Sequence, residues 1–241
     1  AAPDINKIGL DIIKNNIEWL IILSANSADS VGINQLLAIK YNHQNNSLEL
    51  VDDDINNEEV ADVLFDLATT YSDVTYLNLS SNELNEDGVS ILAGYVPNLP
   101  NLTALNLDAN DEIDDSGLAE ISHAVSVHPS ITSLSFSSCD IVDGIVFFEN
   151  AFANSKSLYQ FNLANNNLGD EGADCIFNAI SRNNNSAIGD LNFADNNFTD
   201  QAVIESINPY LSESSTLRVL SLAFNDIEDD GVQSLAQALR S

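Results

Sequence analysis

The side chains best suited to chemistry in this 241-residue chain are carboxylates, and the densest group of them follows Asn110. Asp111, Glu112, Asp114 and Asp115 could supply the oxygen ligands that hard cations such as Ca²⁺ prefer. An EF-hand calcium loop also needs a glycine and a distal glutamate at fixed positions, and this segment lacks both. We therefore predict no metal site and interpret these acids first as residues that begin a helix.

The sequence contains no recognisable catalytic signature. There is no glycine-rich phosphate loop, no Gly-x-Ser-x-Gly elbow and no paired Cys or His spacing typical of zinc. Two cysteines, Cys139 and Cys175, are too few for a disulfide framework. His123 and His128 are expected at the surface, near the end of a helix and in the loop after it. We predict no catalytic residue, no cofactor and no enzymatic activity.

The charge of the chain restricts its partners. The chain contains seven Lys and Arg residues but 37 Asp and Glu residues, which gives a formal net charge of −30. Nucleic acids and anionic membranes require clustered cations, so the composition argues against both. A field of this sign attracts basic proteins or cations, although solubility alone explains the charge equally well. No apolar run approaches the roughly 18 residues of a membrane span, so we expect a soluble protein, either cytoplasmic or secreted or translocated into a host cell.

Residues 161–172, FNLANNNLGDEG, could form a hairpin turn, a loop of cation ligands or one unit of a repeat. The rest of the chain favours the repeat. The template L-x-x-L-x-L-x-x-N-x-L, followed by glycine, is matched eight times, and the ninth positions are separated by 27–30 residues. The residues at these ninth positions are Asn26, Asp53, Asn82, Asn110, Cys139, Asn166, Asn196 and Asn225.

The residue pattern of each unit predicts a strand, a turn, a helix and a return loop. Positions 4 and 6 have the alternation of a strand with one buried face, and a buried amide at position 9 can bond to the backbone where the strand ends. We therefore expect the ninth positions to form a structural ladder. Because one unit cannot bury its apolar faces alone, the units must stack into a single-domain solenoid. We expect residues 1–16 to form an N-terminal capping helix and residues 17–241 to form eight repeats, the last without an obvious cap.

Over roughly residues 17–241, the pattern and its length resemble the leucine-rich repeats of the ribonuclease-inhibitor type. Relatives with this repeat include Ran GTPase-activating protein and the sensor regions of NOD-like receptors. The resemblance implies an α/β fold, a right-handed horseshoe with a concave parallel sheet and convex helices. It says little about function, because one fold can present many different binding sites.

The sheet positions that point away from the helices predict a small, polar and nearly uncharged surface. Aromatic residues and arginine are common hot spots of interfaces, so those at or beside this surface are candidate contacts. They could equally cover the edge of the sheet. The candidate partner-binding residues are Tyr76, Asn78, Asn106, Ser135, Tyr159, Asn162, Asn192, Arg218, Ser221 and Phe224.

Acidic residues are concentrated where each strand gives way to a helix. Nineteen of the 37 acids lie within five residues after a ninth position. One acid per unit is explained by the helix dipole, at about 0.3–1 kcal/mol each, but most units have more, and the excess costs self-repulsion. We therefore predict an acidic rim that steers a basic partner. Its candidate residues are Glu86, Asp87, Asp114, Asp115, Asp170, Glu171, Asp229 and Asp230.

The sequence thus predicts a non-enzymatic module that binds a protein partner on the concave sheet and the adjacent acidic rim. Two alternatives stay open. One is a regulator of a small GTPase or another enzyme, by analogy with Ran GTPase-activating protein. The other is a translocated bacterial effector that acts on a host protein, which the Asn- and Ile-rich, Lys-poor composition would fit.

Overall fold

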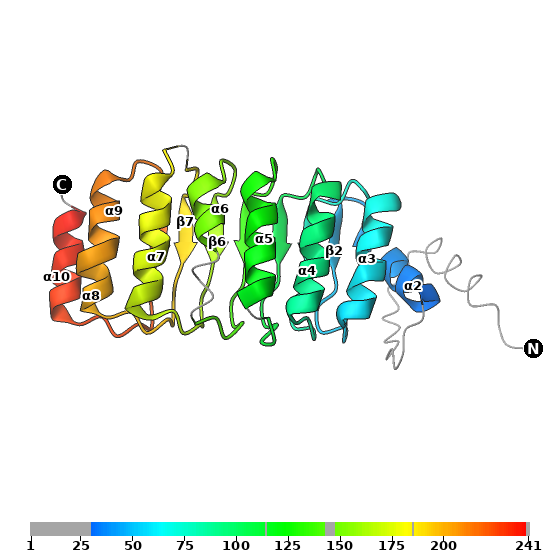
Figure 1. Cartoon of the computed structure of the whole chain (residues 1–241), viewed down its shortest axis with the longest axis horizontal. Coiled ribbons are helices and arrows are strands. Elements are labelled where there is room, and N and C mark those ends of the chain that lie inside the picture. The colour runs from blue at the N-terminus through cyan, green and yellow to red at the C-terminus, as the bar shows by residue number, and fades with distance from the viewer. Residues whose placement is uncertain (1–29, 114, 143–147, 185, 240–241) are drawn as a thin grey trace, which may run out of the picture.

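The computed structural model describes residues 30–113, 115–142, 148–184 and 186–239, and it shows one layer of helices on one sheet (Figure 1). The strands follow one another in chain order, and those from β2 to β8 are parallel. The strands are β1 (Tyr41–Asn42), β2 (Ser47–Glu49), β3 (Tyr76–Asn78), β4 (Ala104–Asn106), β5 (Ser133–Ser135), β6 (Gln160–Asn162), β7 (Asp190–Asn192) and β8 (Val219–Ser221).

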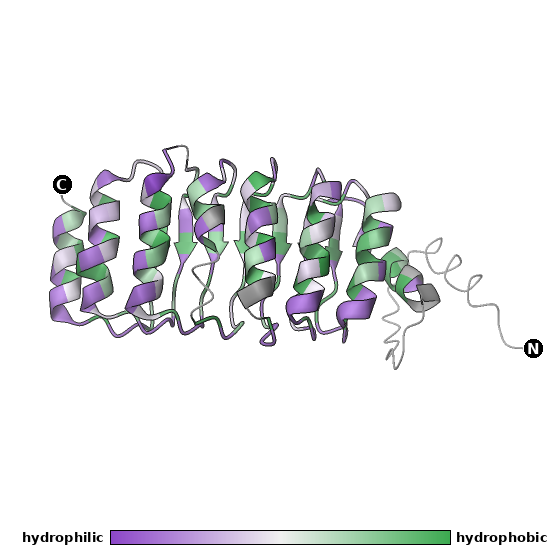
Figure 2. Ribbon diagram, in the orientation of Figure 1, coloured by the Kyte–Doolittle hydropathy of each residue, from purple (hydrophilic) through white to green (hydrophobic). Residues whose placement is uncertain are grey.

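Helices connect consecutive parallel strands and cover one face of the sheet. They are α2 (Ser30–Lys40), α3 (Asn57–Thr69), α4 (Glu86–Tyr95), the 3₁₀ turn η1 (Val96–Asn98), α5 (Asp115–Val127), α6 (Glu149–Asn154), α7 (Gly169–Arg182), α8 (Asp200–Ala202), the π-helical turn η3 (Val203–Ile207), α9 (Asn208–Glu213) and α10 (Asp229–Ala238). Figure 2 shows hydrophilic residues at the lower ends of α3, α4 and α7, where these helices begin.

The repeats stack in register, so equivalent residues of successive units lie side by side. Leu48 pairs with Leu77, which pairs with Leu105, and the same row continues to the last strand. The side chains at positions 4 and 6 of the inner repeats point into the core and are at most 1% exposed, as at Phe161 and Leu163. The α/β solenoid predicted from the sequence is confirmed.

At the N-terminal edge, β2 is paired with the antiparallel strand β1 and not with a parallel strand of a preceding repeat. Tyr41 lies opposite Leu48, and Asn42 lies opposite Ser47. The expected capping helix, the strand of the expected first repeat and Asn26 lie outside the described residues. Among those that are described, the parallel sheet therefore contains seven repeats.

A left-handed residue ends each parallel strand of the described repeats and turns the chain toward the helix layer. The residue just before every ninth position has φ between 55° and 60°, although none of these residues is glycine. A bulky residue is strained in this region, so Phe224 is the most demanding member of the series. The members are Asp52, Ser81, Ala109, Ser138, Asn165, Asp195 and Phe224.

The glycine near the start of a helix makes room for a side chain of the preceding repeat. A Cβ atom added at Gly88 would lie 2.3 Å from Asn57 Oδ1. That oxygen accepts from the backbone N–H of Asn85 at 3.3 Å, while Asn57 Nδ2 donates to Asn85 Oδ1 at 2.5 Å. The same crowding recurs at Gly231, where the added Cβ would lie 2.4 Å from Asp200 Oδ1. These glycines allow adjacent helix starts to approach each other.

We predict that Gly88→Ala lowers the free energy of unfolding by about 1–3 kcal/mol, because the new methyl group displaces Asn57 from its bonds. The matched control is Gly94→Ala in the same helix, where an added Cβ meets nothing within 4 Å. That variant should instead be stabilised by up to about 1 kcal/mol, since alanine favours a helix more than glycine does. Urea unfolding followed by circular dichroism measures both, and equal effects at the two glycines would contradict this explanation.

His128 is buried, with 6% of its surface exposed, so the expectation that it lies at the surface is wrong. Its Nδ1 accepts from the backbone N–H groups of Ser130 at 3.3 Å and Ile131 at 3.2 Å. In the next repeat, Ser155 Oγ accepts from the N–H groups at the same two offsets. His128 therefore holds the return loop before β5 and needs a neutral Nδ1 to do so. Burial lowers the pKa of His128.

We predict that His128→Asn reduces the dependence of stability on pH. The folded-state pKa lies below the unfolded value, so the contribution of neutral His128 is complete above about pH 6.5 and is lost as the pH falls from there through the lowered pKa. The difference in unfolding free energy between the wild type and His128→Asn should therefore shrink between pH 7.5 and pH 5. Urea titrations at both pH values measure it, and a constant difference would contradict the prediction.

Candidate functional site

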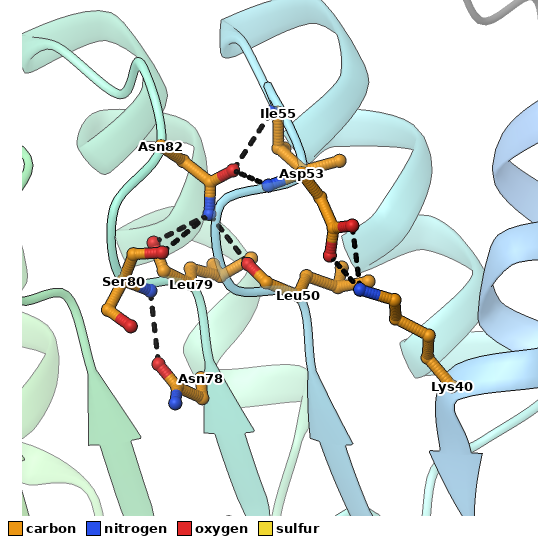
Figure 3. A network of polar contacts seen from close by, with 8 residues as sticks. All are labelled: Lys40, Leu50, Asp53, Ile55, Asn78, Leu79, Ser80 and Asn82. Atoms are coloured by element: carbon orange, nitrogen blue, oxygen red, sulfur yellow. Dashed lines mark hydrogen bonds and ion pairs between the residues drawn. The ribbon is translucent and has the colours of Figure 1, made fainter. Parts of the chain in front are cut away.

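The ninth-position side chains connect neighbouring repeats through the backbone, as Asn82 shows in Figure 3. Asn82 Oδ1 accepts from the N–H groups of Asp53 at 3.2 Å and Ile55 at 2.9 Å. Asn82 Nδ2 donates to the carbonyls of Leu50 at 2.6 Å and Leu79 at 2.9 Å. One buried amide thus forms hydrogen bonds with backbone groups of two units. Without it, these groups would be buried away from water with no hydrogen-bond partner.

The other ladder positions vary this arrangement. Asn110, Asn166 and Asn225 bond to backbone groups of two repeats in the same way. Cys139 Sγ donates to the Leu107 carbonyl at 3.3 Å, and burial raises the pKa of this thiol to about 12, so it is unsuited to act as a nucleophile. At the N-terminal end, Asp53 forms an ion pair with Lys40 at the end of α2 (Figure 3).

Asn196 is the exception in the ladder. Its Nδ2 donates to the Leu163 carbonyl at 2.8 Å, but its buried Oδ1 has no hydrogen-bond partner in the described structure. The preceding unit contains residues 161–172, where Gly169 has φ +57° and its N–H donates to the backbone carbonyl of Asn196. The glycine thus diverts the chain from the path that it follows in the other units. The three asparagines of this segment consequently differ: only Asn166 belongs to the ladder.

The face of the sheet that the helices leave uncovered, which we call the open sheet face, consists of positions 3, 5 and 7 of the seven described repeats. It carries three carboxylates, Glu49, Asp108 and Asp190, and within the seven described repeats neither Lys nor Arg occupies any of these positions. The face comprises Ser47, Glu49, Val51, Tyr76, Asn78, Ser80, Ala104, Asn106, Asp108, Ser133, Ser135, Ser137, Gln160, Asn162, Ala164, Asp190, Asn192, Ala194, Val219, Ser221 and Ala223.

The asparagines of the open sheet face are already engaged with their own strands. Asn78 Oδ1 accepts from the N–H of Ser80 at 3.0 Å, and Asn106 Oδ1 accepts from the N–H of Asp108 at 2.8 Å (Figure 3 for Asn78). Asn162 and Asn192 do the same with residues two positions on. Each amide is therefore fixed in orientation and has only its NH₂ group left to donate to other side chains.

Tyr76 lies on β3 within this face and is half-buried. Its phenol oxygen lies near the side chains of Asn106 and Asn78. Burial raises the pKa of Tyr76, and the carboxylates of Glu49 and Asp108 raise it further, while the neighbouring amides of Asn106 and Asn78 act in the opposite direction. Of the residues predicted as partner contacts, Tyr76, Asn78 and Asn106 therefore form one cluster.

Ser135 and Ser221 also lie on the open sheet face, on β5 and β8. Ser135 Oγ donates to Asp108 Oδ1 at 2.5 Å and accepts from Asn162 Nδ2 at 2.9 Å. Because these bonds cross from β4 to β6, they connect three strands of the face. The sequence did not single out Glu49 and Asp108 as contacts, although their positions 5 and 7 in the repeat place them on this face.

The remaining predicted contacts lie apart from the Tyr76 cluster. Tyr159, 42% exposed, precedes β6, and its ring covers Gly189, where an added Cβ would lie 2.1 Å from the ring. Arg218 precedes β8, and its Nη1 donates to two backbone carbonyls of the adjacent loop at 2.9 Å. Phe224 is 87% exposed and follows β8, at the opposite end of the strand. The predicted contacts therefore do not form one continuous patch.

The acidic rim lies at the starts of the helices, but the residues that cap those helices are mostly uncharged. Asn56 caps α3 in a capping box with Glu59, Asn85 caps α4, and Thr199 caps α8. Asp170 has a structural role, because its two carboxylate oxygens accept from the backbone N–H and the hydroxyl of Thr199 at 2.8 and 2.6 Å.

The other rim residues occupy the first turn of a helix. Glu86 and Asp87 begin α4, Glu171 lies in α7, and Asp229 and Asp230 begin α10. All of these except the half-buried Glu86 are exposed. Asp115 begins α5, but its side chain and the whole of Asp114 lie outside the described part of the structure.

The described residues contain no group of three or more His, Cys, Asp or Glu side chains placed to hold a metal ion. Within that same part of the chain, no helix has both the length and the apolar composition that crossing a membrane requires.

Comparisons with known proteins agree on the repeat. The family described as Leucine Rich repeat matches residues 72–93, 98–122, 154–177 and 213–236. The chain is 29% identical to NACHT, LRR and PYD domains-containing protein 13 of Homo sapiens over 168 residues, which are 68% of this chain and 16% of that protein. It is 27% identical to Tonsoku-like protein of Bos taurus over 213 residues, which are 85% of this chain and 15% of that protein.

Two solved structures share the fold. Leiomodin-1 Actin-Binding Site 2 has a TM-score of 0.52 at 19% identity, covering 64% of this chain and 87% of that one. The tropomodulin C-terminal domain of Caenorhabditis elegans has a TM-score of 0.52 at 14% identity, covering 63% and 91%. The chain spans less than a fifth of the length of each curated relative named above.

Proposed function

The chain is a leucine-rich repeat solenoid of the ribonuclease-inhibitor type, and we propose that its open sheet face binds a basic segment of another protein. Solenoids of this type are protein–protein interaction modules and are typically not enzymes. Their stacked repeats present an extended surface, which suits a long partner element better than a small molecule. The acidic rim then acts as the region that steers the partner toward the sheet.

The observation that carries this proposal is the charge of the open sheet face. Glu49, Asp108 and Asp190 are its only charged residues within the described repeats, and all three are negative. Three of the four described cations are engaged elsewhere: Lys40 pairs with Asp53, Arg182 pairs with Glu149, and Arg218 donates to backbone carbonyls. The fourth, Lys156, is exposed in the loop before β6 and outside the face. A partner segment with lysine or arginine side chains would neutralise these carboxylates, whereas an acidic partner would be repelled.

The acidic rim extends the same sign of potential beyond the sheet. Glu171, Asp229 and Asp230 are exposed carboxylates in the first turns of α7 and α10. Fields of this kind act mainly on the rate of association, because they raise the local concentration of an oppositely charged partner. We therefore assign the open sheet face to contact and the rim to steering.

Affinity capture from a lysate, followed by mass spectrometry, tests the proposal. The baits are the wild type, Tyr76→Ala/Tyr159→Ala, and a control with two exposed apolar residues of the helix layer removed, Phe65→Ala/Ile204→Ala. A partner that binds the open sheet face should be lost with the first variant and retained with the control. The proposal is wrong if the captured proteins are the same for all three baits, or if only the helix-layer variant loses them.

Regulation of a small GTPase and a translocated effector role stay alternatives from the sequence. A GTP-hydrolysis assay with and without the purified chain tests the first of them, and the identity of a captured partner bears on the second. Both would be compatible with binding on the open sheet face, so neither changes the site that the capture experiment probes.

A further inference from the structure

We propose that Glu49, Tyr76 and Asp108 form a subsite for one cationic side chain, lysine or arginine, of the bound protein segment. This inference rests on the proposed function, because it specifies a contact within the open sheet face. We call these three residues the Tyr76 subsite. They lie on or directly after β2, β3 and β4, which are neighbours in the sheet.

The register of the strands brings the three side chains to one region of the face. Glu49 lies opposite Asn78, two residues after Tyr76 on the same face of β3. Asn78 in turn lies opposite Asn106, two residues before Asp108 on the same face of the next unit. Neighbouring strands lie about 4.8 Å apart and a strand rises about 3.3 Å per residue, so two strand spacings and two residues separate Glu49 from Asp108, roughly 12 Å between their Cα positions. Tyr76 comes from the strand between them, two residues before the level of Glu49.

The Tyr76 ring is held in place from both sides. The side chains of Asn78 and Asn106 lie near its phenol oxygen, and the oxygen of each amide is bonded to its own strand at 3.0 and 2.8 Å. These fixed neighbours restrict the ring before any ligand arrives, which reduces the entropy lost on binding. It remains only half-buried, so part of its surface is accessible to a ligand.

The two carboxylates have capacity left for a ligand. Asp108 Oδ1 accepts from Ser135 Oγ at 2.5 Å and from the N–H of Ser137 at 2.6 Å, while Oδ2 has no hydrogen bond within the described chain. Glu49 is exposed. The third carboxylate of the face, Asp190, begins β7, and its Oδ2 accepts from Gln160 Nε2 at 3.0 Å. Two of the three carboxylates of the face therefore come from the strands on either side of Tyr76.

An aromatic ring on the strand between two carboxylate-bearing units favours an organic cation. The face of the ring attracts ammonium and guanidinium groups, and the carboxylates supply acceptors for their N–H groups. A metal ion is a poorer fit, because the described chain places no three ligating side chains together. Toward the C-terminal end, position 7 is Ala164, Ala194 and Ala223. Most of the cationic part of the partner should therefore lie over β2–β4, since β6–β8 contribute a single carboxylate, Asp190, to the face.

A pair of matched peptides tests the Tyr76 subsite by NMR. The probes are acetyl-Gly-Arg-Gly-amide and acetyl-Gly-citrulline-Gly-amide, which differ in the charge of one side chain of nearly the same shape. They are titrated into the 241-residue chain, in which the tyrosines are labelled with ¹³C. We expect the arginine peptide to shift the Tyr76 ring signals saturably and the citrulline peptide to bind at least roughly fivefold more weakly.

Charge-matched variants locate the effect. Glu49→Gln/Asp108→Asn keeps one acceptor oxygen in each side chain but removes both charges, and it should weaken arginine-peptide binding at least roughly fivefold. The control Asp62→Asn/Glu120→Gln removes two exposed charges from α3 and α5 and should leave it unchanged. Equal binding of the two peptides, or equal loss in both variants, would overturn the subsite.

The captured partner separates this outcome from the proposed function. If its binding is lost with Tyr76→Ala/Tyr159→Ala but unchanged with Glu49→Gln/Asp108→Asn, the open sheet face is correct and the cation subsite is wrong. If neither variant affects binding, both the subsite and the proposed function are wrong. The expected result is that both variants weaken the complex.

Discussion

Asn166→Ala should lower the free energy of unfolding by about 3–5 kcal/mol, more than we expect for the glycine and histidine substitutions described above. Asn166 is 5% exposed. Its Oδ1 accepts from the N–H groups of Cys139 at 3.1 Å and Ile141 at 3.0 Å, and its Nδ2 donates to the carbonyls of Phe136 and Leu163 at 2.9 Å. Alanine would leave these buried backbone groups without partners.

Asn167→Ala is the matched control for this prediction. Asn167 is adjacent in the chain but exposed, and its Nδ2 donates to Asp140 Oδ1 at 2.9 Å on the surface. Its replacement should change stability by no more than about 0.5 kcal/mol. Urea unfolding measured by circular dichroism compares the two variants. A loss below about 1 kcal/mol at Asn166, or equal losses at both positions, would contradict a structural role for the ladder.

The second large effect concerns salt. Raising the ionic strength from about 0.1 M to 1 M shortens the Debye length from about 10 Å to about 3 Å, so the rim would no longer act at a distance. The complex with a captured partner should then weaken roughly thirty- to a hundredfold, mostly through slower association. Surface plasmon resonance over this range measures both rate constants.

A rim variant shows whether the acidic rim causes this dependence. Glu171→Gln/Asp229→Asn/Asp230→Asn removes three exposed charges that lie in the first turns of two helices. It should reduce the salt dependence of the association rate and leave the dissociation rate nearly unchanged. Binding that is insensitive to salt in the wild type would show that the net charge of −30 serves solubility and not recognition.

The fold could be predicted from the sequence because the same pattern of buried positions recurs in every repeat. Buried positions such as Leu48 and Phe161 recur at the same place in each unit, and the sheet pairs them in register. The pairing of β1 with β2 was not predictable in this way. Tyr41–Asn42 belongs to no repeat position, so no periodic signal indicates that an antiparallel strand covers the edge of β2.

The candidate site was predictable only in part. Position within the repeat indicates which side chains reach the open sheet face, but it does not show which of their atoms are already bonded. The sequence suggests that the side chains of Asn78 and Asn106 are free to contact a partner. In the structure, however, their amide oxygens accept hydrogen bonds from backbone N–H groups of their own strands. Glu49 and Asp108 were overlooked because a nearly uncharged surface was expected, and the role that we propose for them depends on Tyr76, which lies on the strand between their units.

The structural role of His128 was likewise not predictable from the sequence. Its place after a helix suggests an exposed loop, and the sequence does not reveal that its ring replaces the serine of the following repeat. Such substitutions of one acceptor for another become visible only when the backbone N–H groups that they satisfy are known.

The central claim is that the open sheet face, and not the helix layer, takes the basic partner. Zero-length coupling of carboxylates to lysine amines, followed by mass spectrometry of the captured complex, tests this most directly, because both faces carry acids. We predict that partner lysines couple to Glu49 and Asp108. Coupling confined to exposed acids of the helix layer, such as Asp62 and Glu120, would contradict the account.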